Sequence, residues 1–156
     1  MDHFWWIAVG IGIVTGLRSM TAPAVVSWAA HLGWLHLQGS PLAWVGSTAA
    51  VAVFSLAAAG EYVADKLPRT PPRTALLGFT ARIIMGALCG ACVGGSAGQS
   101  FLLGALLGIV GAIVGTLGGY QVRTQLVKAL KVKDIFVAIP EDLVAVGLGF
   151  VLVSIR

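Results

Sequence analysis

The sequence predicts an all-α bundle of membrane-spanning helices that forms a single domain over residues 1–156. Hydrophobic residues make up 58% of the chain and charged residues only 10%, and the mean hydropathy is +0.93. A soluble core of this size could not bury so many apolar side chains. The apolar residues also fall into segments separated by short polar loops, so the lipid bilayer is the first predicted partner of this multi-pass chain.

Three segments are long enough to cross the membrane as single helices. Residues 41–64, 75–97 and 101–122 are each rich in apolar side chains. Each can span the roughly 30 Å of hydrocarbon in a bilayer as an α-helix. We therefore expect three long transmembrane helices.

The first apolar segment, residues 4–36, has an unsuitable length. As one helix it would be about 50 Å long, which is too long for one crossing and too short for two. Arg18 interrupts it, and Gly16 and Pro23 bracket the interruption, where proline removes a backbone donor. We expect this helix to be broken, tilted or re-entrant. We also expect it to be retained, because no basic cluster precedes it as in a secretory signal.

The last apolar segment, residues 143–155, is too short for a crossing at about 20 Å. It follows Pro140, Glu141 and Asp142, and proline before first-turn acids is a helix-start signature. We expect a half-length helix here, which gives about five membrane segments in total. The alternative is a short final helix whose two acids lie at the water interface.

The loops differ strongly in charge. The connection at residues 66–73 and the stretch at residues 123–133 are basic, whereas residues 38–40 and 98–100 carry no charge. By the positive-inside rule the basic loops face the cytoplasm, which predicts a bacterial cytoplasmic (inner) membrane. Residues 123–133 are interpreted as a basic helix extension at the anionic surface. The net charge of +4 follows from these loops, so no nucleic-acid partner is expected.

Arg18 is the centre of the candidate functional site. A charge within hydrocarbon is costly unless it is paired or hydrated, so it indicates function by default. Glu61 and Asp65 share one helix face near the basic loop. A cationic centre could therefore meet several carboxylates, which would bind a cation, relay a proton or lock the helices together. The candidate site comprises Arg18, Ser19, Thr21, Glu61, Asp65, Glu141 and Asp142.

Three ordered motifs resemble a known family. They are Gly-Leu-Arg ending at Arg18, Glu-x-x-x-Asp-Lys-x-Pro over residues 61–68, and the Glu-Asp pair at residues 141–142. Together they resemble the bacterial integral membrane proteins of domain-of-unknown-function family 4126 (DUF4126). The resemblance implies no assigned activity. It selects as family-defining positions Arg18, Glu61, Asp65, Lys66, Pro68, Glu141 and Asp142.

Glycines form one stripe on each of two successive helices. Small residues at spacings of three and four let membrane helices approach closely. The stripes favour packing within the subunit, and the alternatives are a homo-oligomer interface or a glycine-lined pore wall. The glycines in these stripes are Gly86, Gly90 and Gly94 on one helix and Gly104, Gly108, Gly111, Gly115 and Gly118 on the next.

The cysteines and histidines are interpreted as structural residues. Cys89 and Cys92 lie mid-membrane among glycines, where they serve as small apolar residues. His31 and His36 lie among tryptophans near an uncharged loop, which is typical of interfacial anchoring. We expect no metal and no cofactor. No phosphate loop, zinc-protease motif or nucleophile elbow is present, so the sequence does not favour an enzyme.

Two functions remain. The first is a small transporter or channel for an ion or small solute, with a polar site formed by broken helices. It predicts that the charged groups converge on a cavity. The second is a non-transporting scaffold or accessory protein, in which the same groups form a dry, fully paired lock and the glycines serve packing and assembly.

Overall fold

The structure is a computed structural model that describes residues 3–68 and 75–155. These residues form helices joined by turns, with no strand among them, so the predicted all-α class is confirmed. Arg69 and Arg73 of the predicted basic loop lie outside the described residues. The elements are α1 (Phe4–Leu17), α2 (Thr21–His31), the short 3₁₀ helix η1 (Ala43–Gly46), α3 (Thr48–Ala64), α4 (Leu76–Ser96), α5 (Phe101–Leu130) and α6 (Ile135–Ser154).

Among the described residues, α4, α5 and α6 are long and apolar enough to cross a membrane, which is the property of a multi-pass membrane protein. The predicted single helix over residues 41–64 is wrong. Its first part forms η1, and Ser47 then caps α3 by accepting a hydrogen bond from the Ala50 amide at 3.1 Å. A serine N-cap sets a helix start, so α3 is left with 17 residues, about 26 Å, at the short limit for a crossing.

The predicted half-length final helix is also wrong. Helix α6 begins at Ile135, contains Pro140 and runs for 20 residues. Pro140 therefore does not start the helix but lies in its second turn. There it removes one backbone hydrogen bond, a loss that the rest of a long apolar helix tolerates.

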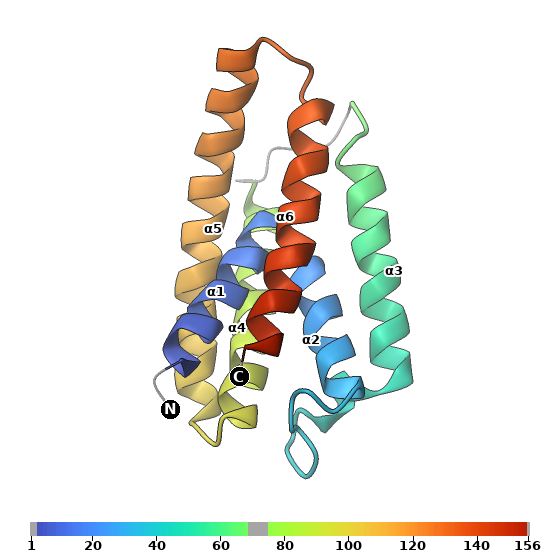
Figure 1. Cartoon of the computed structure of the whole chain (residues 1–156), viewed down its shortest axis with the longest axis vertical. Helices are drawn as coiled ribbons and strands as arrows, with labels where there is room; N and C mark the ends of the chain where they lie inside the picture. The colour runs from blue at the N-terminus through green and yellow to red at the C-terminus, as the bar shows by residue number, and fades with distance from the viewer. Residues whose placement is uncertain (1–2, 69–74, 156) are drawn as a thin grey trace.

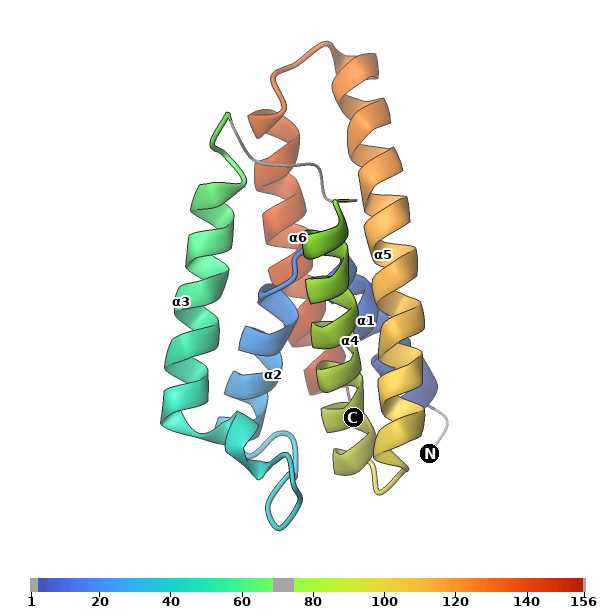
Figure 2. The same ribbon diagram turned by 180° about the vertical axis from the view of Figure 1, so that it is seen from behind.

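The bundle has two chemically different ends (Figures 1 and 2). We name the first the basic end; it holds Lys66, Lys131 and Lys133, near the connections from α3 to α4 and from α5 to α6. We name the second the neutral end; it holds residues 32–47 and the turn at residues 97–100, which carry no Lys, Arg, Asp or Glu. Both chain ends point toward the neutral end.

Helices α1 and α2 form a re-entrant hairpin. They are too short to cross, at 14 and 11 residues. The start of α1 and the chain after α2 lie at the same end of the bundle, because His3 and Leu35 line one cavity together with Gln99 of the neutral end. The hairpin thus enters from the neutral end, turns at Arg18 and returns (Figure 1). This resolves the length problem of residues 4–36, which break as expected.

Glycine brings three helices into backbone contact. A Cβ added to Gly90 of α4 would lie 2.1 Å from the Gly104 carbonyl oxygen of α5. A Cβ added to Gly12 of α1 would lie 2.3 Å from the Gly108 carbonyl oxygen. One face of α5 therefore packs against both α4 and α1, which also contact each other. The predicted stripes face helices of the same chain, except at Gly118, where an added Cβ would meet no atom within 4 Å.

Candidate functional site

The tip of the hairpin lies deep in the bundle. Thr116 of α5 donates a hydrogen bond to the Gly16 carbonyl at 3.3 Å, just before the turn. Thr116 is about 22 Å along α5 from Phe101, near the middle of this helix of about 45 Å. Irregular backbone at such depth must be satisfied by protein or by water.

Glu61 satisfies the backbone at the turn. Its Oε1 accepts hydrogen bonds from the Ser19 amide at 2.9 Å and the Ser19 hydroxyl at 2.8 Å. Its Oε2 accepts from the Met20 amide at 2.9 Å. Met20 is the N-cap residue of α2, so a carboxylate from α3 occupies the positive end of the α2 dipole. Glu61 is therefore a capping group and not the ion-pair partner of Arg18.

Arg18 joins the hairpin tip to two other helices. Its Nη1 lies 2.7 Å from the Asp65 Oδ2, just beyond the end of α3, and its Nη2 contacts the Asp142 Oδ1 of α6. The Tyr62 ring completes the enclosure, with its centroid 5.7 Å from the guanidinium carbon. The Arg18 side chain is only 2% exposed, against 14% for each of the two acids. The intramembrane arginine is thus paired from two sides.

A second arginine extends the network toward the basic end. Nη1 of Arg123 lies 3.0 Å from Asp65 Oδ2 and 3.4 Å from Glu141 Oε2, and its Nη2 contacts the exposed Asp134. Asp65 is therefore shared by two guanidiniums. Burial alone would raise the pKa of the Asp65 carboxyl, but Arg18 and Arg123 outweigh it and hold this pKa below its usual value.

We name the group of six charged residues the Arg18 cluster. It holds four carboxylates but only two guanidiniums, so acids are in surplus. Each carboxylate contacts Arg18, Arg123 or the hairpin backbone. Two of the carboxylates come from the end of α3 and two from α6. The cluster comprises Arg18, Glu61, Asp65, Arg123, Glu141 and Asp142.

The structure brings the predicted site residues together in different roles. Asp65 and Asp142 contact Arg18, whereas Glu141 contacts Arg123. Ser19 bonds to Glu61, and the Thr21 hydroxyl lies 2.6 Å from the Tyr62 hydroxyl. The predicted set is thus a single group in space.

Arg123 and Tyr62 are the residues that the sequence interpretation missed. Arg123 was assigned to the basic extension of the surface, yet it is 13% exposed and contacts three carboxylates. A signal was present, because Arg123 lies seven residues after Thr116. That spacing places it on the same α5 face that packs against α1.

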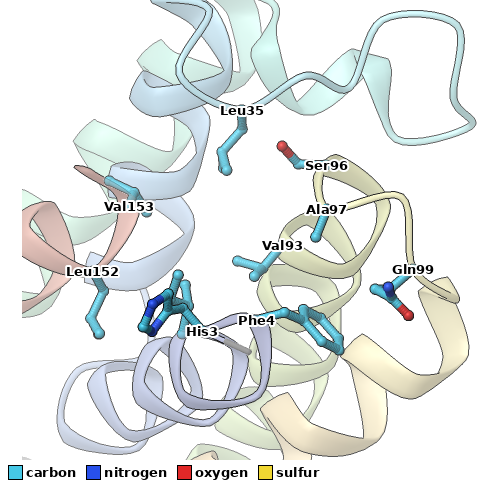
Figure 3. Close-up of a pocket in the computed structure, with 10 residues that line it drawn as sticks. His3, Phe4, Leu35, Val93, Ser96, Ala97, Gln99, Leu152 and Val153 are labelled. Atoms are coloured by element: carbon cyan, nitrogen blue, oxygen red, sulfur yellow. The ribbon is translucent and has the colours of Figure 1, made fainter. Parts of the chain in front are cut away.

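The neutral end contains a cavity of about 400 Å³. Figure 3 shows its labelled side chains around an open space, with His3 and Phe4 from the start of the hairpin on one side and Leu35 and Ser96 opposite. Between Phe4 and Arg18, the fully buried Ile11 and Val14 fill α1. An apolar core therefore separates this cavity from the Arg18 cluster.

The cysteines and histidines lie away from the cluster. Cys89 and Cys92 are free thiols, fully buried in the core. The His31 Nδ1 lies 2.9 Å from the Gly46 carbonyl oxygen at the neutral end. In the part of the chain that the structure describes, no three His, Cys, Asp or Glu residues are arranged to hold a metal ion.

With this geometry established, comparison with known proteins decides the family. The model of the family described as domain of unknown function DUF4126 matches residues 6–155. The chain belongs to the DUF4126 family. This confirms the resemblance seen in the three motifs, and the match to DUF4126 includes the Arg18 cluster and all but the first two residues of the hairpin. Searches of curated proteins and of solved structures gave no match to this DUF4126 chain.

Proposed function

We propose that this protein is a small transporter or channel for a cation, with its polar site at the tip of the α1–α2 hairpin. The observation that carries the proposal is Arg18, held at the hairpin tip within the bundle between Asp65 and Asp142 of two other segments. Broken helices at such depth commonly form the substrate or ion sites of transporters.

The charge of the cluster favours a cation over an anion. Four carboxylates surround two guanidiniums, and Lys66 next to Asp65 offsets only one of the two surplus acids. A small cation or a proton could displace a guanidinium from a carboxylate and take its place. An anion would have to enter a site that is already negative, which is electrostatically unfavourable.

The access routes support an occluded site. The cavity at the neutral end is lined by the start of the hairpin, and Asp65, Glu141 and Asp142 near its tip remain 13–14% exposed. The apolar residues Ile11 and Val14 close the path between them. Movement of the hairpin against α3 and α6 would then open one side at a time.

In this proposal the protein resides in the cytoplasmic membrane of a bacterium. Its basic end faces the cytoplasm, because basic residues near helix ends are retained on that side. The hairpin accordingly enters from the outer face. No enzymatic step is part of the proposed function.

The test is ion flux into proteoliposomes that contain the full-length protein. Sodium, potassium and proton gradients are applied in turn and followed with ion-sensitive dyes. We expect flux of one of these ions, and an at least tenfold lower rate for Asp142→Asn, which keeps shape but removes the charge beside Arg18. Lys128→Gln is the control, since it also removes one charge, but from an exposed side chain of α5 that takes no part in the ion pairs of the cluster.

Two results would contradict the transport proposal. One is the absence of flux of any of the three ions with the wild-type protein. The other is equal flux in Asp142→Asn and the Lys128→Gln control, which would show that the Arg18 cluster is not on the path.

A specific observation favours the second candidate function, a non-transporting scaffold or accessory protein. Arg18 is only 2% exposed and is bonded from two sides, as a structural lock requires. On this alternative, wild-type liposomes conduct none of the ions, yet Asp142→Asn still lowers the stability of the bundle. Flux and stability measured on the same variant therefore separate the two functions.

A further inference from the structure

A lateral groove opens between α5 and α6, apart from the cavity at the neutral end. It has a volume of about 550 Å³, and the tip of the hairpin forms its floor at Ile13 and Leu17. Apart from Arg123 and Glu141 at its polar side, its lining consists of apolar residues and glycines. The two helices are consecutive in sequence, but they stand apart along this groove.

The rim of the groove has the character of a lipid-facing surface. Its rim residues are large and apolar, and Leu126, Phe136 and Val144 are 41%, 65% and 58% exposed. It runs along α5 from Val114 to Leu130, a length of about 24 Å. This narrow apolar shape fits an extended hydrocarbon chain, and the volume is within the roughly 300–1,000 Å³ of small-ligand sites.

The mouth of the groove carries positive charge. The loop from α5 to α6 closes it at the basic end, and Lys131 and Lys133 in this loop are exposed. Exposed lysines at a membrane surface attract anionic headgroups. We propose that this groove is a binding site for an anionic phospholipid, with one acyl chain between α5 and α6 and the headgroup at Lys131 and Lys133.

This lipid would lie against the Arg123–Glu141 pair of the cluster. The proposal does not depend on transport, because a structural lipid would occupy the same groove in a scaffold. In hydrocarbon no hydrophobic gain drives a lipid chain into the groove. Selection of one lipid over the bulk therefore depends on fit along the groove and on headgroup charge.

The first test fills the groove. A Cβ at Gly118, which lines the groove, meets no atom within 4 Å, so Gly118→Leu is accommodated and occupies the space for the acyl chain. Gly147→Leu is the matched control, because Gly147 is also an exposed helical glycine with open space but does not line the groove.

Native mass spectrometry of the purified full chain, titrated with phosphatidylglycerol, measures the bound lipid. We expect saturable binding of phosphatidylglycerol to the wild type and to Gly147→Leu, and its loss in Gly118→Leu. Equal lipid binding in all three proteins would overturn the proposal. A wild-type dimer that only Gly118→Leu dissociates, with no bound lipid, would also overturn it and assign the groove to a second copy.

The second test concerns the headgroup. We expect Lys131→Gln with Lys133→Gln to reduce the preference for phosphatidylglycerol over phosphatidylcholine by up to about thirtyfold, equivalent to about 1 kcal/mol for each lysine. An unchanged preference would overturn the assignment of the headgroup. Inorganic phosphate should compete only weakly, because it lacks the acyl chain, and full displacement by phosphate would contradict a lipid site.

Discussion

Replacement of Arg18 by methionine tests whether the cluster holds the hairpin in place. Methionine keeps much of the side-chain length but removes the guanidinium that contacts Asp65 and Asp142. Asp65 retains Arg123 at 3.0 Å, so the main loss is at Asp142. Removal of one partner of a buried ion pair costs about 3–5 kcal/mol because the other charge is left uncompensated.

We expect a cost near the lower limit, about 3 kcal/mol, because Asp142 is 14% exposed and can recruit water or a proton. The double variant Arg18→Met with Asp142→Asn removes both charges, so it should be more stable than Arg18→Met alone. The two single changes should therefore be non-additive, by about 1–3 kcal/mol, as for residues in direct contact.

The assay is reversible unfolding in mixed micelles titrated with sodium dodecyl sulfate, which gives the free energy of unfolding for the four proteins of the cycle. A purely additive cycle would refute the contact between Arg18 and Asp142. A cost below about 0.5 kcal/mol for Arg18→Met would refute the buried ion pair, since such values are typical of surface changes.

Three further predictions follow from the packing, the cap and the hairpin. In the same unfolding titration, Gly90→Ala should destabilise the protein by about 1–3 kcal/mol, because its Cβ would meet a backbone carbonyl of α5. Gly147→Ala is the control and should not destabilise the protein, because a Cβ there meets no atom. Equal effects of the two changes would contradict close backbone packing. Glu61→Gln should lower the free energy of unfolding by about 1–2 kcal/mol, because the NH₂ group of glutamine cannot accept a hydrogen bond from the backbone amide that it would face. An unchanged free energy of unfolding would argue against the cap. His3→Cys and Gln38→Cys should react with a membrane-impermeant maleimide from the same side, whereas labelling from opposite sides would mean that the segment crosses.

The buried thiols make that labelling experiment practicable in the wild-type background. Cys89 and Cys92 are both fully buried, so they should not react with the maleimide until the protein is unfolded. Mass spectrometry before and after addition of denaturing detergent provides the check.

The sequence alone indicated much of the fold and the membership of the site. Composition indicated a membrane bundle, and the length of residues 4–36 indicated a broken, tilted or re-entrant segment, with Arg18 as the place for a break. The conspicuous polar residues formed one candidate group, and the structure places them near one another. The local sequence around Pro140 predicted a helix start, and this prediction was wrong. The apolar residues before Pro140 belong to the same helix, because they can pack along the bundle.

Only the tertiary structure assigned partners within that group. Sequence spacing shows which residues share a helix face, but it does not show which helix a side chain meets. The structure therefore decided that Glu61 caps the α2 backbone, that Asp65 and Asp142 hold Arg18, and that Arg123 belongs to the cluster. The physical reason is that these contacts join α1, α3, α5 and α6 across large sequence separations, and their geometry depends on the re-entrant turn and on glycines that let the backbones touch.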